Sequence, residues 1–239
     1  MTTASYQERR GELETYFDRT AVDAWSRLTS DAPVSGIRAT VRAGRDEMRR
    51  TLLSWLPADL AGVRMLDAGC GTGALSVEAA RRGADVVAID LSPTLVGLAA
   101  ERLPADLAPG SGAGAGRIEF RVGDMLDPGL GSFDHVVAMD SLIHYEPSDI
   151  VRVLAGIAPR TARSILFTIA PRTPLLTLMH AVGRVFPRSD RAPAIVPVAA
   201  KSLTALIAAE PALAGWRPGR LHRVTRGFYI SEALEFVRS

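Results

Sequence analysis

The sequence predicts a doubly wound α/β protein with a Rossmann-like sheet, on three observations. From about residue 63 onward, short apolar segments alternate with helical ones, which is typical of a parallel sheet covered on both faces. A glycine-rich turn, "DAGCGTG" at 67–73, follows the first apolar segment. The last two segments, 216–227 and 228–237, fit an antiparallel pair. We therefore expect a mostly parallel sheet that closes with an antiparallel strand.

Two helices are predicted before this core. Apolar residues recur at helical intervals over 5–28, with Ser5 as a plausible N-cap, and a second helical pattern covers about 37–56. No strand lies between the two patterns. We therefore expect residues 1–60 to form an N-terminal helical arm or lid, and residues 61–239 to form the core.

The core is predicted to contain alternating strands and helices, with two successive strands at 117–124 and 133–140. Ser92 is the expected N-cap of its second helix, with Pro93 in the first turn. In chain order, the expected elements are strand 63–69, helix 73–83, strand 85–90, helix 92–103, strand 117–124, strand 133–140, helix 147–158, strand 163–171 and helix 201–210.

Two segments interrupt the alternation. The Gly/Ala-rich segment 104–117 is predicted to be a linker. The segment 171–198 is interpreted as an insertion that combines an apolar helix with arginines and five prolines.

Composition describes an ordinary globular protein. Of 239 residues, 47% are hydrophobic and 23% charged, which excludes a disordered or fibrous chain. No apolar run approaches the roughly 20 residues that a bilayer span needs, and the N-terminus lacks the apolar region of a signal peptide. The single cysteine, Cys70, excludes an internal disulfide. We therefore expect a cytoplasmic protein.

Charge is distributed unevenly. Residues 160–239 carry 12 Lys and Arg against 4 Asp and Glu, whereas residues 1–159 carry 16 against 22. This asymmetry indicates a basic surface for an anionic ligand, membrane surface or acidic partner, or else a solvated arginine-rich face. Nucleic acid is not expected, because the chain has one lysine and no nucleic-acid-binding signature.

The glycine-rich turn predicts a ligand held close to the backbone. It lacks the Gly-Lys-Ser/Thr ending of a phosphate-binding P-loop, and its third glycine comes one residue too early for a dinucleotide fingerprint. Asp67, directly before the turn, would repel a pyrophosphate and attract a ligand with ammonium and sulfonium groups. The turn therefore favours a cationic, nucleoside-containing ligand over a dinucleotide.

Acidic residues at the following strand ends support that interpretation. Asp90 is placed to accept both hydroxyls of a ribose, and Asp124 to accept an adenine amino proton. Asp140 ends the fourth strand at the same edge. Ligands of doubly wound sheets bind in the crevice at this carboxyl edge.

These residues resemble the class I S-adenosylmethionine-dependent methyltransferases. The resemblance implies S-adenosyl-L-methionine as the methyl donor, and it implies no protein-bound metal. The residues that it implies for cofactor binding are Asp67, Ala68, Gly69, Cys70, Gly71, Gly73, Asp90, Leu91, Gly123, Asp124, Met125 and Asp140.

A closer resemblance is carried by "YFDRTAVDAW" (16–25), "MDSLIHY" (139–145) and "RGFYISE" (226–232). With the glycine turn, these segments are similar to the magnesium-protoporphyrin IX O-methyltransferases of bacteriochlorophyll biosynthesis. The longer "APGSGAGAG" connection departs from that family's pattern. The resemblance implies methyl transfer to a propionate carboxylate of Mg-protoporphyrin IX, whose magnesium belongs to the substrate.

Two residues are predicted for the reaction centre: His144 from its position after the fourth strand, and Tyr16 from its match to the family's N-terminal segment. His144 follows the fourth strand and would orient or donate to the carboxylate, while Tyr16 would position the substrate. For the propionates, the basic half offers Arg217, Arg220, Arg223 and Arg226, although a solvated strand face explains these residues equally well.

Several alternatives stay open from the sequence. They are a methyltransferase acting on a quinone, phenol or other carboxylate, a non-catalytic S-adenosylmethionine-binding protein, and, least favoured, a nicotinamide dehydrogenase. Two further expectations follow from the family: hand-over of substrate by the porphyrin-binding subunit of magnesium chelatase, and peripheral association with the inner, photosynthetic membrane.

Overall fold

The computed structural model describes residues 4–19, 36–108, 116–172 and 195–239. The helices are α1 (Ala4–Arg19), α3 (Gly36–Ser54), α4 (Ala74–Arg81), α5 (Pro93–Glu101), α6 (Pro147–Ile157) and α8 (Ala200–Ala209). The strands are β1 (Arg64–Ala68), β2 (Asp85–Asp90), β3 (Arg117–Val122), β4 (Phe133–Ala138), β5 (Thr161–Pro171), β6 (Pro197–Val198), β7 (Trp216–Arg226) and β8 (Tyr229–Arg238).

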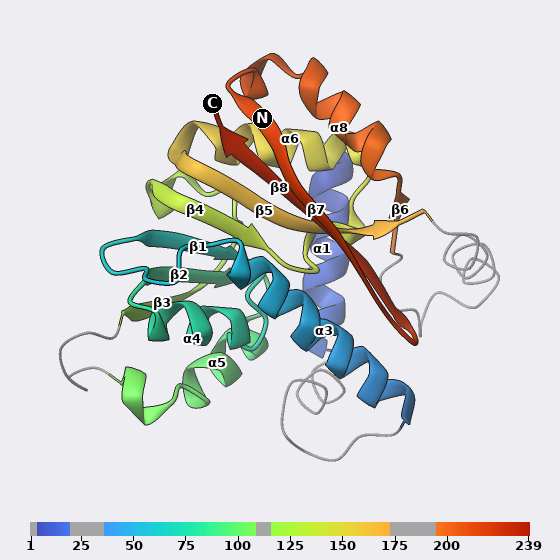
Figure 1. Ribbon diagram of the computed structural model, residues 1–239. Coiled ribbons are helices and arrows are strands. Elements are labelled where there is room, and N and C mark those ends of the chain that lie inside the picture. The colour runs from blue at the N-terminus through green and yellow to red at the C-terminus, as the bar shows by residue number, and fades with distance from the viewer. Residues whose placement is uncertain (1–3, 20–35, 109–115, 173–194) are drawn as a thin grey trace.

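The strands form one sheet in the order β3-β2-β1-β4-β5-β8-β7, and β6 pairs with the end of β5 (Figure 1). Strands β1 to β5 run parallel, whereas β8 is antiparallel to both of its neighbours. From β1, the strands β2 and β3 follow toward one edge of the sheet. From β4, the strands β5, β8 and β7 follow toward the other edge. This topology confirms the predicted doubly wound fold, and it places the switch point, where such sheets bind ligands, between β1 and β4.

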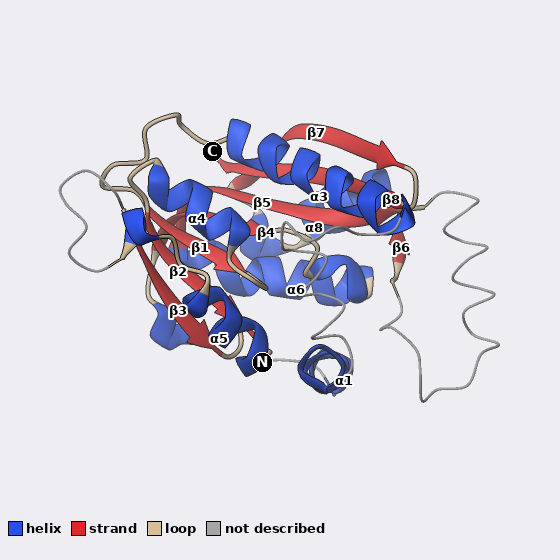
Figure 2. Cartoon of the chain, turned by 90° about the horizontal axis from the view of Figure 1, so that it is seen from below, coloured by secondary structure: helices blue, strands red, loops and turns tan. Residues whose placement is uncertain are grey.

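Two hydrophobic clusters cover the two faces of the sheet. Because side chains alternate along a strand, Met65 belongs to the cluster under α3 and α4, and its neighbour Leu66 to the cluster under α6 and α8. Figure 2 shows α3 and α4 above the sheet and α6 below it. The strands β1, β2, β4 and β5 are consequently buried on both sides along most of their length, which agrees with their apolar sequence, whereas the edge strand β7 is largely exposed.

Helix α3 is seated on the hairpin formed by β7 and β8. A Cβ atom at Gly44 would lie 2.5 Å from the Tyr229 ring, and one at Gly227 would lie 2.7 Å from the hydroxyl of Thr40. Glycine at both contact points therefore lets the helix and the hairpin approach closely. At the end of the hairpin, Arg226 Nε also donates to a Glu47 carboxylate oxygen at 2.6 Å.

Helix α1 packs on the opposite side, against α5 and α6. The ring of Tyr6 stacks on that of Tyr145 with the centroids 5.2 Å apart. The Asp18 carboxylate accepts from Thr94 Oγ1, at the start of α5, at 2.5 Å. The two predicted N-terminal helices thus occupy different walls of the molecule.

Some local predictions were wrong. Ser5 is not an N-cap, because α1 already includes Ala4 and the Ser5 hydroxyl donates instead to Asp149 at 2.9 Å. The prediction of a linker at 104–117 is not tested, because residues 109–115 lie outside the described residues; the segment begins with a short helical turn (Ala105–Leu107), whose Leu107 is buried. The predicted insertion ends in β6, which no sequence signal indicated.

Other local predictions were correct or cannot be compared. The Ser92 side chain accepts from the backbone N–H of Leu95 and caps α5 as expected. The end of the first predicted helix and most of the 171–198 insertion lie outside the described residues.

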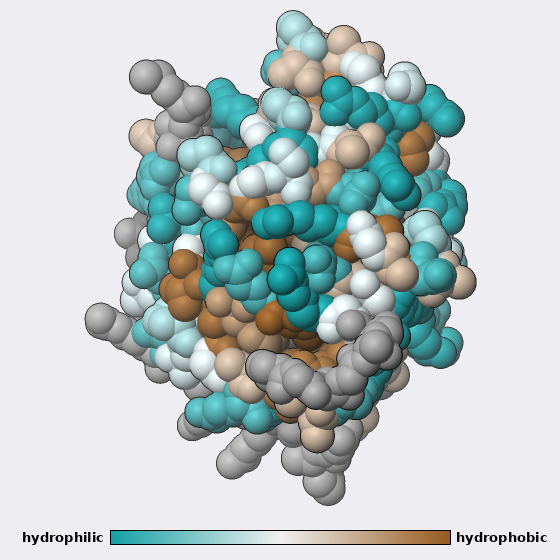
Figure 3. All heavy atoms as spheres, turned by 90° about the vertical axis from the view of Figure 1, so that its left-hand side faces the viewer, coloured by the Kyte–Doolittle hydropathy of each residue, from teal (hydrophilic) through white to brown (hydrophobic). Residues whose placement is uncertain are grey.

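The surface seen in Figure 3 is mostly polar, with apolar side chains showing between polar ones near its centre. None of the helices in the described ranges combines the length and the apolar character that crossing a bilayer requires.

Candidate active site

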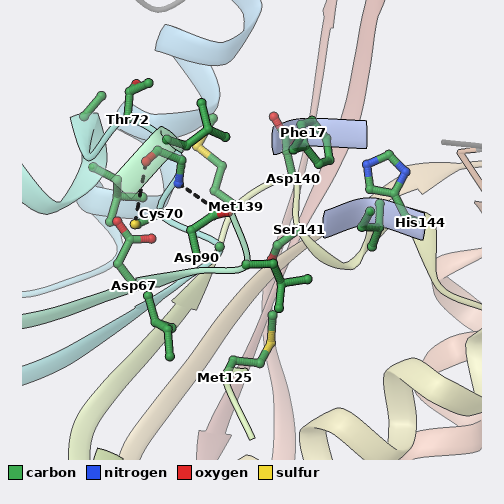
Figure 4. A pocket seen from close by; sticks show the side chains of 18 of the residues that line it. Phe17, Asp67, Cys70, Thr72, Asp90, Met125, Met139, Asp140, Ser141 and His144 are labelled. Carbon is green, nitrogen blue, oxygen red and sulfur yellow. Dashed lines mark hydrogen bonds between the residues drawn. The ribbon is translucent and has the colours of Figure 1, made fainter. Parts of the chain in front are cut away.

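A cavity of about 270 Å³ opens at the carboxyl ends of the parallel strands, between α1 and α3. The glycine turn and the residues after β2, β3 and β4 form its floor (Figure 4). It lies at the switch point of the sheet, as the topology requires. The predicted residues that line it are Asp67, Gly69, Cys70, Gly71, Asp90, Leu91, Gly123, Asp124, Met125, Asp140 and His144.

Three predicted residues are not among those lining the cavity. Ala68 is fully buried within β1. Gly73 is the N-cap of α4, where an added Cβ would contact Phe120 at 3.1 Å, so its small size serves packing of the helix on the sheet. Tyr16 is half-buried on α1, with its ring edge-on to that of Phe17, which does line the cavity.

The glycine turn takes a conformation that favours glycine. Gly69 and Gly71 have φ angles of 85° and 54°, in the left-handed region. A Cβ atom at Gly69 would collide with the side chain of Ser141. The amides of Gly69 and Cys70 both donate to the carbonyl of Ile89 in β2, which fixes the turn to the neighbouring strand. The turn is therefore a rigid backbone cradle.

Asp67 is a buried acid at the end of β1. Its carboxylate accepts a 2.6 Å hydrogen bond from the Ser76 hydroxyl of α4. Burial raises the pKa of Asp67 to about 7, and this rise outweighs the opposing effect of the Ser76 bond. A cation brought close to this carboxyl would favour its ionised form.

Asp90 is anchored at the end of β2. One carboxylate oxygen accepts from the amide of Gly71 at 2.8 Å, and the other from the amide of Ser92 at 3.0 Å. Burial raises the pKa of Asp90, whereas the amide hydrogen bonds act in the opposite direction. These bonds orient the carboxylate toward the cavity, where it can also accept from paired hydroxyls.

Asp124, after β3, is contacted by helix α1. The Tyr6 hydroxyl donates to it at 2.8 Å, and a guanidinium nitrogen of Arg10 lies 3.5 Å from its other oxygen. The backbone amide of Leu126 donates as well, at 2.9 Å. The acid predicted for the adenine side is thus also the point where α1 meets the cavity.

Asp140 connects β4 to three other elements. It is the one non-glycine residue of the described chain with a left-handed φ, 54°. Arg45 of α3 donates to its carboxylate at 2.7 Å, as does the hydroxyl of Tyr229 in β8 at 3.0 Å. Its amide donates to the hydroxyl of Thr168 in β5 at 2.7 Å. With its carboxylate held in this way, Asp140 orients the backbone that leads to His144.

His144 ends a short helical turn (Leu142–His144) and is 7% exposed. Its ring meets that of Phe17 edge-on, with 6.0 Å between centroids. Figure 4 shows both side chains on one side of the cavity, across from the glycine turn. A hydrogen-bonding imidazole therefore faces the space in front of the cofactor cradle.

Cys70 is a free thiol in the cavity wall. Burial and the neighbouring acids raise its pKa, which leaves it a poor nucleophile. Within the described residues, no group of three or more His, Cys, Asp or Glu side chains is arranged to hold a metal ion.

A row of arginines on α3 was not predicted from the sequence. Arg42, Arg45 and Arg49 line the cavity, although the sequence directed attention to β7 instead. Their spacing of three and four residues places them on one helix face, which is the signal that could have identified them.

The β7 arginines do not line the cavity, and three of them are paired with acids. Arg220 binds Glu235, Arg223 binds Glu232, and Arg226 binds Glu47. The acids belong to β8 and α3, so these three guanidinium groups are paired within the molecule.

Sheet order, glycine cradle and the three acids after β1, β2 and β3 together define a class I S-adenosylmethionine-dependent methyltransferase. The residues fit the cofactor: a rigid turn for close backbone contact, Asp90 for ribose hydroxyls, and Asp67 for a positively charged group. Comparison with known proteins gives the same class. A family described as "Methyltransferase domain" matches residues 65–162.

A second family, "Magnesium-protoporphyrin IX methyltransferase C-terminus", matches residues 138–238. The magnesium-protoporphyrin O-methyltransferase of Rhodobacter capsulatus is 51% identical over 234 residues, which cover 98% of each chain. The crystal structure of magnesium protoporphyrin IX methyltransferase from Synechocystis PCC 6803 with bound SAH superposes with a TM-score of 0.80 at 28% identity. That match covers 96% of this chain and all of the other. The chain belongs to the magnesium-protoporphyrin O-methyltransferase family.

Proposed function

We propose that this protein transfers the methyl group of S-adenosyl-L-methionine to a propionate carboxylate of Mg-protoporphyrin IX, giving the monomethyl ester in (bacterio)chlorophyll biosynthesis. The observation that carries the proposal is the 51% identity, over nearly the whole of both chains, to a relative of that name. The cavity supports it, because the cofactor cradle and His144 line the same space.

The bound cofactor supplies an electrophilic methyl group on a positively charged sulfur. Within this chain, the backbone of the glycine turn, Asp67 and Asp90 would hold it, with Asp124 on the adenine side. The binding roles of these residues are part of the proposal.

The acceptor needs no strong base. A carboxylic acid has an ordinary pKa near 4, so the propionate is already ionised at neutral pH. Catalysis then consists of aligning one carboxylate oxygen with the methyl group and excluding water. His144 is the residue that we assign to this alignment, through a hydrogen bond from its imidazole to the carboxylate.

Tyr16 is assigned a positioning role. Its ring contacts Phe17, and Phe17 contacts His144, so Tyr16 would act by fixing this pair of rings rather than by touching the reacting atoms. Residues 1–60 would supply the cover of the acceptor site, with α1 forming one wall and α3 the other, while residues 61–239 form the core.

The test is direct. Purified protein is incubated with S-adenosylmethionine and Mg-protoporphyrin IX, and the pigment is analysed by mass spectrometry. A gain of about 14 Da, the mass of one CH₂ by simple arithmetic, that mild alkali removes identifies an ester of a propionate. No gain, with cofactor binding retained in calorimetry, would overturn the acceptor and leave the methyltransferase class in place.

Two interactions extend the proposal. The substrate would be delivered by the porphyrin-binding subunit of magnesium chelatase, and the protein would work in the cytoplasm at the surface of the inner, photosynthetic membrane. The poor water solubility of a large macrocycle is the physical reason for direct delivery. Faster methylation of chelatase-bound than of free substrate would support the hand-over, and equal rates would contradict it.

A further inference from the structure

The segment "RGFYISE" (226–232) carries part of the resemblance to the family, yet none of its residues, all of which the structure describes, lines the cavity. It forms the end of β7, the turn of the hairpin and the start of β8. Its central residue, Tyr229, is buried. The phenol nevertheless reaches the site through a hydrogen bond to Asp140, which does line the cavity.

The carboxylate of Asp140 is held by side chains from three elements. The hydroxyl of Tyr229 in β8 donates to it at 3.0 Å. Arg45 of α3 donates to it at 2.7 Å, and Thr168 of β5 at 3.2 Å. Burial and the neighbouring Asp140 raise the pKa of Tyr229, so its phenol stays protonated and remains a donor. The acceptor positions of the carboxylate are thus used inside the protein, which makes it an anchor for the chain.

Asp140 needs an anchor because its backbone takes an uncommon conformation. Its φ angle of 54° lies in the left-handed region, and no other non-glycine residue of the described ranges shares it. Aspartate tolerates this region better than most residues do, but it is still less stable than the ordinary regions. Such a conformation persists only where the surrounding contacts over-determine it. Removing one donor from the carboxylate should therefore let the backbone relax.

The chain from Asp140 to His144 is short and closely packed. Ser141 lies against the glycine turn, since a Cβ atom at Gly69 would collide with its side chain. The short helical turn that ends in His144 starts directly afterwards with Leu142, which is fully buried. A change of backbone direction at Asp140 would therefore move the imidazole, because no flexible segment lies between them to absorb it.

We propose that Tyr229 is a positioning residue for methyl transfer: its hydroxyl holds Asp140 in the left-handed conformation that directs His144 toward the acceptor carboxylate. The inference rests on the proposed function and deepens it, because Tyr229 acts through His144 and touches neither substrate. The glycine turn is fixed separately, by the carbonyl of Ile89 and the carboxylate of Asp90. Tyr229 should thus affect the reaction and leave cofactor binding intact.

The experiment compares Tyr229→Phe with the wild type, because this change keeps the ring against Gly44 and removes only the hydroxyl. Glu47→Gln is the matched control. It weakens another contact between α3 and the hairpin, the ion pair with Arg226, and none of the contacts described for Glu47 involves Asp140. We measure kcat, KM for both substrates, and the Kd of S-adenosylmethionine by calorimetry.

Tyr229→Phe should lower kcat about tenfold, a fraction of the roughly 100-fold that a misplacement of about 1 Å can cost. The Kd of S-adenosylmethionine should not change. The double variant Tyr229→Phe/His144→Gln should be no slower than His144→Gln alone, because residues that act as one unit are not additive. The imidazole NMR signals of His144, identified by their absence from His144→Gln, should shift in Tyr229→Phe. Glu47→Gln should behave as wild type in every measurement.

Four results would overturn the assignment. A wild-type kcat, or His144 signals that do not move, would mean that the hydroxyl does not position the imidazole. A further loss of about tenfold in the double variant would mean that Tyr229 acts independently of His144. A higher Kd for S-adenosylmethionine would place the effect on the cofactor cradle. An equal loss in Glu47→Gln would place it on the general seating of α3.

Failure of the proposed function would look different. Absence of any methylation by the wild type contradicts that function itself. The His144 signals can be recorded whether or not the pigment is methylated, so they test the link from Tyr229 to the imidazole in either case.

Discussion

The hydroxyl of Tyr6 donates a 2.8 Å hydrogen bond to the carboxylate of Asp124, although the two residues lie 118 positions apart in the sequence. This bond joins the first helix to the loop after β3. Burial and the neighbouring acid raise the pKa of Tyr6, so the phenol stays protonated and remains a donor. The position of α1 is therefore linked to a residue on the adenine side of the cofactor site.

Replacing Tyr6 should loosen α1 without unfolding the core. Tyr6→Phe keeps the stacking on Tyr145 and removes about 1 kcal/mol of hydrogen bonding, equivalent to roughly fivefold faster amide exchange within α1. Hydrogen exchange followed by mass spectrometry measures it. The control is Arg9→Gln, which breaks only the local ion pair with Glu12. Unchanged exchange in Tyr6→Phe would show that the bond does not hold the helix.

Loss of the Asp90 carboxylate should weaken cofactor binding selectively. In Asp90→Ala the acceptors for ribose hydroxyls are gone, and we expect Kd for S-adenosylmethionine to rise about 10- to 100-fold in calorimetry. Asp85→Ala, at the other end of β2 and paired with Arg117, is the control. Wild-type affinity in Asp90→Ala would remove the ribose assignment.

Cofactor affinity should depend on pH through Asp67. Its pKa is about 7 in the free protein, so the acid is largely protonated at pH 6 and largely ionised at pH 8. A cationic ligand favours the ionised form, and binding therefore releases a proton below pH 7. Affinity should rise with pH by at most about tenfold per unit and level off above 7.

Comparison with Asp67→Asn isolates this effect, because titration of the ligand itself is common to both proteins. The ratio of wild-type to variant affinity should increase between pH 6 and 8. A ratio that stays constant would mean that Asp67 does not sense the cofactor's charge.

His135 should make the fold sensitive to acid. It lies buried in β4, hydrogen-bonded to Ser164 at 2.7 Å, and burial lowers its pKa. Because the unfolded chain binds a proton at His135 more readily than the folded chain, protonation of His135 favours unfolding. The stability that depends on neutral His135 is therefore fully present above about pH 6.5. Stability should fall by up to about 1.4 kcal/mol per unit as the pH drops below that value, until the folded-state pKa is reached.

Urea unfolding at several pH values tests this expectation. His135→Gln should show a flatter stability profile than the wild type, whereas His222→Gln, a change at an exposed position of β7, should retain the wild-type slope. Identical slopes in all three proteins would place the acid sensitivity elsewhere.

His144 should affect the reaction and not the binding of the cofactor. His144→Gln keeps a hydrogen-bonding side chain of similar size but changes its geometry, and we expect kcat to fall about 100-fold. Calorimetry with S-adenosylmethionine should give the wild-type Kd. A wild-type kcat would end the assignment of His144 to the alignment of the carboxylate.

The sequence predicted the strand-end acids well and the helix-borne residues poorly. Asp67, Asp90 and Asp124 could be found because parallel strands end at one edge of the sheet, so sequence position alone brings the three side chains together. Nothing comparable tells which face of α3 meets the cavity. That orientation depends on the contact between Gly44 and Tyr229, residues far apart in the chain.

The basic C-terminal part shows the same difficulty in another form. Counting charges gave an excess of cations in this part but could not show which of them are paired: Arg220 and Arg223 bind Glu235 and Glu232 on the adjacent strand. These pairs follow from the β7–β8 register, which contains an irregularity between Pro218 and Leu221. A charge count does not show how two strands are paired. The left-handed backbone conformation of Asp140 was likewise not predicted from the sequence.

The close seating of α3 on the hairpin bears on how this family could acquire new acceptors. Any side chain larger than hydrogen at Gly44 would press on Tyr229, whose hydroxyl holds Asp140 beside the reaction centre. Substitutions in the α3 wall would therefore impair catalysis before they changed which acceptor is bound. The α1 wall carries its own links to the site, through Tyr6 to Asp124 and through Phe17 to His144. A change in the tetrapyrrole accepted should therefore require concerted substitutions in both walls and not a single replacement in one of them.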